Sequence, residues 1–210
     1  MIERLACRLG RNDEAPNIEL AEYLCLNNDT VGIEEIVGGI RGKDNAVAND
    51  CIKVLYEIGE RKPELIAAYA NDIISCLRSK NNRLVWGGMT ALAKIVDIAA
   101  APIYARLTDI LAAYETGSVI TVDNSISVFA GLCKANESYS AILLPVLIRH
   151  FHDCKPKEVA QHAERASVCF NNTNAGDFIA VLETRKPHLT PASRARIEKM
   201  IKKLRHDRLM

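Results

Sequence analysis

The chain has 210 residues, of which 49% are hydrophobic, 25% charged and 5% aromatic, and its formal net charge is +1. These values are ordinary for a globular domain, and few aromatic residues with abundant Ala, Leu and Ile favour helices over strands. Its apolar runs are shorter than the roughly 18 residues that a membrane-spanning helix needs, which excludes a transmembrane protein.

The distribution of charge and the spacing of the cysteines indicate which kind of globular protein this is. Residues 1–184 contain 18 Lys and Arg against 24 Asp and Glu, whereas residues 185–210 contain 9 against 2, so a basic tail follows an acidic body. The seven cysteines have no CxxC spacing, and the N-terminus is too charged for a secretory signal. We therefore expect reduced cysteines in a cytoplasmic protein.

The N-terminal region predicts an irregular pair of helices. Apolar residues at Ile2, Leu5, Ala6 and Leu9 have helical spacing, and residues 17–27 supply a second helix. From residue 33 onward, one helical stripe returns every 37 residues. Its four copies are Ile33, Ile36, Val37 and Ile40; Ala70, Ile73, Ile74 and Leu77; Leu107, Ile110, Leu111 and Tyr114; and Leu144, Leu147, Ile148 and Phe151. Four apolar copies at one spacing predict a repeat protein.

A second helix follows each copy of the stripe. Its buried positions are expected at Val47, Cys51, Val54, Leu55 and Ile58; Leu84, Gly88, Ala91, Leu92 and Ile95; Thr121, Ser125, Val128, Phe129 and Leu132; and Val159, Ala163, Ala166, Ser167 and Phe170. Asp44, Asn81 and Ser118 stand where an N-cap residue is needed, and Pro156 suits a first helical turn. Gly88 should let the paired helix approach closely, and Gly87 should do the same more mildly toward a neighbour.

Segments 44–58 and 81–95 resemble the second helix of the HEAT-repeat family, whose pattern is Asp-x-x-Val-Arg-x-x-Ala-x-x-Ala-Leu-x-x-Ile. The resemblance covers residues 31–172 well and departs at the Arg position, which holds Ala48, Val85, Val122 and Ala160. It implies an all-α fold, a right-handed α-α superhelix (a HEAT-like solenoid) of about six helix pairs. We expect a single domain over residues 1–210, with 1–30 and 175–210 as irregular capping pairs. A basic outer face suits the last cap, although these cations could also contact an acidic partner.

The resemblance also implies a binding groove, because second helices line the concave surface of such solenoids. The groove rows would hold Asn49, Trp86, Asp123 and Gln161; Lys53, Thr90, Ser127 and Arg165; and Tyr56 with the small residues Ala93, Ala130 and Val168. A lone Trp among polar side chains is typical of a binding hot spot. The alternative is that Trp86 packs flat over Ala93 and the neighbouring helix.

Catalytic motifs are absent from the sequence. There is no glycine-rich phosphate loop, nucleophile elbow or plausible triad, and no His-Glu dipeptide of the kind that binds iron in HEAT-type deoxyhypusine hydroxylases. The segment 149–154 contains His150, His152 and Cys154, with His162 nearby, but the two first histidines point about 200° apart on a helix. We therefore expect a polar helix end, no metal, no cofactor and no enzyme.

The sequence favours a non-catalytic scaffold that binds another macromolecule, most simply a protein, through the concave groove. The alternative is a nucleic-acid-binding protein or a HEAT protein of the DNA alkylation-repair type. Trp86 and Asp123 resemble the Trp and Asp of the groove in such repair proteins. Only Lys53 and Arg165 supply cations to the groove rows, whereas phosphate binding needs a basic stripe. The partner's identity and the oligomeric state stay open.

Overall fold

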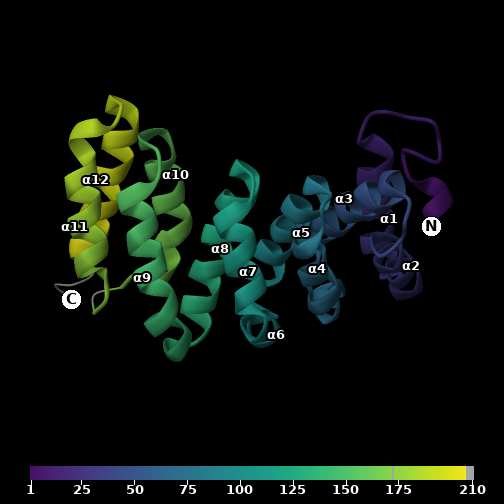
Figure 1. The fold of residues 1–210 in the computed structure, drawn as a ribbon, viewed down its shortest axis with the longest axis horizontal. Coiled ribbons are helices and arrows are strands. Elements are labelled where there is room, and N and C mark those ends of the chain that lie inside the picture. The colour runs from purple at the N-terminus through teal and green to yellow at the C-terminus, as the bar shows by residue number, and fades with distance from the viewer. Residues whose placement is uncertain (172, 207–210) are drawn as a thin grey trace. The chain divides into compact units, whose positions relative to one another are not determined.

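A computed structural model of the chain describes residues 1–171 and 173–206, and within these residues the fold is all-α, without a strand (Figure 1). The chain divides into two compact units, Met1–Val128 and Phe129–Met210, and the division falls inside α8. The expected all-α repeat class is confirmed. The expectation of one domain over residues 1–210 stays a prediction. None of the described helices is long and apolar enough to cross a membrane.

The described residues contain twelve α-helices and six short 3-10 helices. The first unit contains α1 (Ala15–Asn27), α2 (Thr30–Ile40), α3 (Asn45–Arg61), α4 (Ala70–Ser75), α5 (Asn82–Ile95), α6 (Ala100–Ala105), α7 (Leu107–Thr116) and the start of α8 (Val119–Ala135). The second unit contains the end of α8, then α9 (Glu137–Asp153), α10 (Pro156–Ala166), α11 (Ala175–Arg185) and α12 (Pro191–His206). The 3-10 helices are Ile2–Arg4, Pro63–Leu65, Ala67–Tyr69, Cys76–Arg78, Ser167–Cys169 and Lys186–His188.

The second helices begin where the capping residues predict. The Asp44 carboxylate accepts a hydrogen bond from the Ala46 amide at 2.9 Å, and the Asn81 side chain accepts one from the Arg83 amide at 3.0 Å. Each cap satisfies a backbone donor that has no partner within its helix. Pro156 opens α10, where its missing N–H costs nothing.

The expected stripes of α3 and α5 form the core of the first unit. Every stripe position on the two helices is buried. A Cβ at Gly88 would lie 3.2 Å from the Cys76 Cβ, so the close approach expected at this glycine is confirmed. A Cβ at Gly87 would lie 2.9 Å from Ile52 on α3. The approach at Gly87 is therefore the closer of the two, and the milder role expected for it is wrong.

The N-terminal pair differs from the prediction. Residues 2–9 do not form an α-helix, because only Ile2–Arg4 is helical and of the 3-10 type. Gly10 has a left-handed φ of +66°, which turns the chain toward α1. The Ala6 amide donates to the Asn17 side chain at 3.0 Å, so a loop and not a helix packs on α1.

Two repeats contain more than a helix pair. Short helices at Pro63–Leu65 and Ala67–Tyr69 precede α4, and α6 precedes α7. Pro63 opens its 3-10 helix, as expected for a residue without an N–H. These segments are too short to show a helical period, so the prediction of simple pairs is incomplete.

The buried face of α9 also differs from the predicted stripe. Leu143, Leu147, His150 and Phe151 are buried, whereas Leu144 and Ile148 are only partly covered. Leu147 and Phe151 are buried as predicted, but Leu143 and His150 replace Leu144 and Ile148, which rotates the buried face by roughly 65° around the helix. A histidine therefore occupies a core position that the sequence pattern gave to an aliphatic residue.

Candidate functional site

Trp86 on α5 is partly exposed and has aromatic and cationic neighbours. Its ring centroid lies 5.9 Å from that of Tyr56 on α3, with the planes tilted by 44°. The Arg83 guanidinium carbon lies 5.5 Å from the indole centroid, one turn earlier on α5. The indole is thus supported by the α3–α5 pair while part of it stays open to solvent. Its aromatic and cationic neighbours are Tyr56 and Arg83.

A charged network lies beside these two rings and is named here the Glu14 network. Its members are Glu14, Lys53, Glu57, Arg61 and Arg83. Buried Lys53 donates to Glu57 at 2.8 Å and contacts the Glu14 carboxylate at 2.9 Å. Glu14 also accepts a hydrogen bond from Arg83 at 2.7 Å. Lys53 was expected to offer a cation to the groove, but it lies beneath the surface with its charge neutralised.

The pKa values of the Glu14 network reflect its ion pairs. Hydrogen bonds from Lys53 and then Arg83 lower the pKa of the Glu14 carboxyl below its ordinary value, against a smaller effect of burial. Burial opposes ionisation of Glu57, but hydrogen bonds from Lys53 and Arg61 outweigh it, and the pKa of Glu57 is also lowered. Burial likewise works against the Lys53 ammonium, yet its carboxylate partners raise the pKa of Lys53. Glu14, Lys53 and Glu57 are therefore charged near neutral pH.

An open hollow of about 540 Å³ lies at the start of α3 and α5. It is named here the asparagine hollow, and it is lined by Asn45, Asn49, Ser79, Lys80, Asn81 and Asn82. The Asn81 amide donates to the Asn49 side chain at 2.8 Å, which joins the two helices across the hollow. Asn82 precedes Trp86 by one helical turn, so its amide and the indole lie on one face of α5.

The other predicted groove residues have different surroundings. Thr90 donates to the Trp86 carbonyl at 2.7 Å and accepts from Asn124 on α8 at 3.0 Å, which links α5 to α8. Asp123 and Ser127 on α8 are half-buried. Gln161 and Arg165 lie on α10 in the second unit, so the described site is confined to the first unit.

Several site residues were missed by the sequence reasoning. Glu14 and Arg83 lie outside the predicted rows, although Arg83 stands three residues before Trp86, a spacing that brings side chains together on a helix. Asn45 and Asn82 are separated by the repeat spacing of 37 residues. That recurrence of asparagine at the helix starts was the available signal for the hollow.

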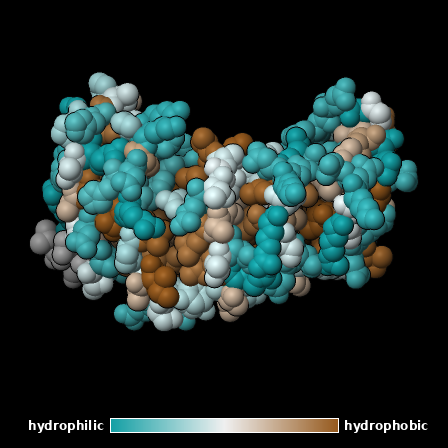
Figure 2. Space-filling model, viewed as in Figure 1, coloured by the Kyte–Doolittle hydropathy of each residue, from teal (hydrophilic) through white to brown (hydrophobic). Residues whose placement is uncertain are grey.

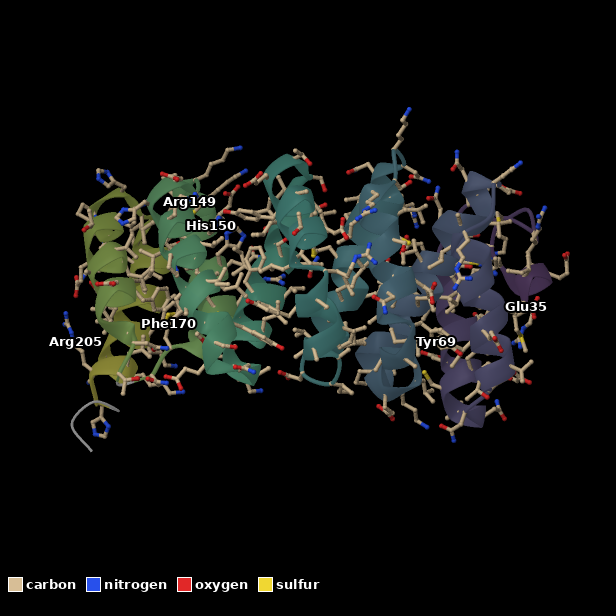
Figure 3. The ribbon with its side chains drawn as sticks, turned by 60° about the horizontal axis from the view of Figure 1, so that its bottom comes forward. Glu35, Tyr69, Arg149, His150, Phe170 and Arg205 are labelled. Atoms are coloured by element: carbon tan, nitrogen blue, oxygen red, sulfur yellow. The ribbon has the colours of Figure 1, made fainter. Side chains whose placement is uncertain are left out.

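The second unit contains a buried pair of histidines. His150 on α9 (Figure 3) and His162 on α10 are 6% and 1% exposed, and the His150 Nε2 lies 2.8 Å from the His162 Nδ1. The half-buried Cys154 thiol joins them, since the three ligand-type atoms lie within 4.8 Å of one another. The segment 149–154 is therefore more than a polar helix end, while His152 is exposed.

The cysteines are all free thiols in the structure. Cys51 and Cys76 are buried as expected, and burial is the main reason that the pKa of each thiol rises to about 12. Burial also raises the pKa of Cys154 to about 11, although the nearby Arg185 charge acts in the opposite direction. Thiols with raised pKa values are poor nucleophiles near neutral pH.

A second surface feature lies on α9. Figure 2 shows hydrophobic side chains on this helix, and Leu144, Pro145 and Ile148 line an open hollow of about 630 Å³ with Phe170. These are the aliphatic positions that the rotated burial pattern leaves partly uncovered.

Comparisons with known proteins identify the fold. No family model matches the chain, and no curated protein matches it significantly. A designed armadillo repeat protein, solved in complex with the peptide (KR)4, is similar over 88% of this chain and 85% of its own, with 12% identity and a TM-score of 0.69. Two engineered proteins are 15% identical, with TM-scores of 0.64 and 0.63. They cover 96% and 98% of this chain, and 96% and 97% of their own chains.

Identities this low show the fold alone. The chain has an armadillo/HEAT-like repeat fold, as its sequence resemblance implies.

Proposed function

We propose that the chain is a non-catalytic cytoplasmic scaffold that binds an extended segment of a protein partner in the groove expected along its second helices. The binding surface would be the asparagine hollow together with Trp86 and Tyr56. The partly exposed Trp86, supported by Tyr56 and Arg83, is the observation that carries this proposal.

The chemistry of this surface suits a polypeptide. Asparagine amides both donate and accept hydrogen bonds, so Asn45, Asn49 and Asn82 match the alternating N–H and C=O groups of an extended backbone. Trp86 adds a large apolar surface at the end of the row, where a partner side chain would gain most from burial. A peptide bound to the designed armadillo repeat protein supports the same mode of use for this fold.

The charges favour a protein over nucleic acid. Nucleic-acid binding depends on cations that can replace the counterions of phosphates. Lys53 is buried between Glu14 and Glu57, and Arg83 is paired with Glu14, so neither provides a free positive charge. The same pairing argues for a scaffold over an enzyme, because these titratable groups are neutralised and held in place. The cytoplasmic assignment rests on the seven free thiols.

A comparative capture experiment tests the proposal. Immobilised wild-type protein, Trp86→Ala and Ile98→Ala would be incubated with extract of the native host, and retained proteins quantified by mass spectrometry. Ile98 is the matched control, because it is 55% exposed and lies three residues after the end of α5. We expect partners that Ile98→Ala retains and that Trp86→Ala loses by at least about tenfold, the effect of removing a hot spot.

Two results would contradict the proposal. One is retention of the same proteins, in the same amounts, by Trp86→Ala and wild type. The other is capture of duplex DNA with a steep dependence on salt, which would favour the nucleic-acid alternative.

A further inference from the structure

The second unit brings together three side chains that commonly bind metal ions. His150 and Cys154 lie one turn apart at the end of α9, and His162 comes from the middle of α10. One ring nitrogen of His150, one ring nitrogen of His162 and the Sγ of Cys154 lie within 4.8 Å of one another. Three ligand-type atoms thus converge on one point from two helices.

The two imidazoles occupy core positions. His150 follows Leu143 and Leu147 along the buried face of α9, and His162 lies between the buried residues Val159 and Ala163 on α10. Aliphatic side chains would fill these positions without the cost of removing polar nitrogens from water. Two buried histidines at such positions therefore indicate a function in addition to packing.

The spacing of the ligand atoms fits a tetrahedral ion after small side-chain rotations. With Zn–N and Zn–S bonds of about 2.0–2.3 Å, tetrahedral ligand atoms stand roughly 3.3–3.6 Å apart. The two histidine nitrogens, now 2.8 Å apart and hydrogen-bonded, would open by about half an ångström on metal binding. The Cys154 sulfur would move inward to join them.

Hydrogen bonds from a neighbouring helix hold the backbone around Cys154 in place. Arg185 on α11 donates to the carbonyls of Phe151, His152 and Cys154, so its guanidinium closes the end of α9. The Glu158 carboxylate accepts the Lys155 amide at 3.2 Å and fixes the start of α10. Positioned backbone around the ligands is what a preorganised metal site requires.

We propose that His150, Cys154 and His162 bind one zinc ion, with the fourth tetrahedral position occupied by solvent. Two imidazoles and a thiolate form the mixed nitrogen and sulfur set that zinc prefers. Binding would release one proton per ion, that of the Cys154 thiol. The proton between the two histidines would move to an outer ring nitrogen, so that the His150 Nε2 and the His162 Nδ1 both face the metal. This inference is independent of the protein-binding proposal, since it concerns the second unit alone.

Cobalt(II) is the probe of choice, because its spectrum reports both geometry and thiolate ligation. Untagged protein, stripped with a chelator under reducing conditions, would be titrated with Co²⁺ and then with Zn²⁺. We expect one Co²⁺ per chain, tetrahedral ligand-field absorption in the visible range, and a thiolate-to-cobalt charge-transfer band. Zn²⁺ should abolish both signals by displacement.

Three variants assign the ligands. Cys154→Ser should remove the charge-transfer band, and His162→Ala should weaken Co²⁺ binding by at least about tenfold. His152→Ala is the matched control, since this exposed histidine lies on the same helix end and should leave the titration unchanged. Circular dichroism would establish that each variant is folded.

The wild-type titration alone can overturn the proposal, even if a variant fails to fold. Absence of stoichiometric binding, or an octahedral spectrum without charge transfer, would mean that the two histidines are a hydrogen-bonded core pair. A charge-transfer band that survives Cys154→Ser would place the metal at another cysteine and would also refute the site.

Discussion

The Glu14 network of the first unit and the histidine pair of the second both bury polar side chains, but they satisfy them in different ways. Lys53 contacts two carboxylates, and every charge in its network faces an opposite charge. His150 and His162 share a hydrogen bond between ring nitrogens, with a thiol beside them. In the first cluster, the charged groups are engaged in ion pairs that hold the helices together. The second cluster consists of side chains of the kinds that bind metal ions, with their ligand-type atoms within 4.8 Å of one another.

The largest effect is expected when the first cluster loses its buried cation. Lys53→Ala should lower the free energy of unfolding by about 3 kcal/mol, because two carboxylates lose their shared partner. Lys53→Met, which retains most of the side-chain volume, should cost about 2 kcal/mol and so isolate the charge effect. Lys94→Met, which breaks the exposed Lys94–Glu60 pair, should cost less than about 1 kcal/mol. Urea unfolding followed by circular dichroism measures all three, and equal losses for Lys53→Met and Lys94→Met would refute the role given to the network.

The corresponding change in the second unit should be somewhat smaller. His162→Ala should destabilise the chelator-treated protein by about 2 kcal/mol, because it leaves a cavity and removes the hydrogen-bond partner of a buried ring nitrogen. The exposed His152→Ala should be close to neutral. Thermal unfolding of the two variants in parallel provides the measurement. Equal stability would mean that the histidine pair contributes nothing to the core.

Removal of the site tryptophan should have a smaller effect on stability again. Trp86 is partly exposed, so Trp86→Ala should cost about 1 kcal/mol, well below the 3–5 kcal/mol typical of a fully buried Trp. Leu92→Ala on the buried face of the same helix should cost about 3 kcal/mol. If urea unfolding gave Trp86→Ala the larger loss, Trp86 would be a core residue and its binding role would fail.

Acid should weaken the Glu14 network by protonating its carboxylates. The pKa values of Glu14 and Glu57 are lowered in the folded state, so their stabilising effect is present above the ordinary value of 4.5 and is lost as pH falls below it. Urea midpoints measured between pH 7 and pH 3 should therefore fall in the wild type below about pH 4.5. In Lys53→Met the acid-induced part of the loss should be smaller, because the lowered carboxyl pKa values return toward normal. An identical acid profile in both proteins would contradict the pairing.

Much of the fold was predictable because helical periodicity is a local property of the chain. The stripes of α3 and α5 and the caps at Asp44 and Asn81 were read correctly from spacing and residue type. The failures fall where that period is weak. Apolar residues have helical spacing in residues 2–9, but Gly10 follows them with a left-handed φ. The short helices before α4 and α7 contain too few residues to reveal a period.

The candidate site was only partly predictable, for reasons of tertiary packing. Spacing on the helix identified Trp86 and Tyr56, but Glu14 reaches Lys53 from the N-cap position of α1, a contact between distant residues that no local pattern encodes. The burial of His150 was not predicted, because the apolar pattern of α9 supports two faces, and packing buries Leu143 and His150 where Leu144 and Ile148 were expected. Its partner His162 lies in the next helix, so the pair could be found only in three dimensions.

The central claim is that a protein segment binds over Trp86, and collisional quenching of its fluorescence tests this most directly. Trp86 is the only tryptophan of the chain, so iodide quenching reports this site alone. The account predicts intermediate quenching in the free protein and clear protection when a peptide from a captured partner is added. A peptide that binds without changing the quenching, or a tryptophan already fully shielded in the free protein, would contradict it.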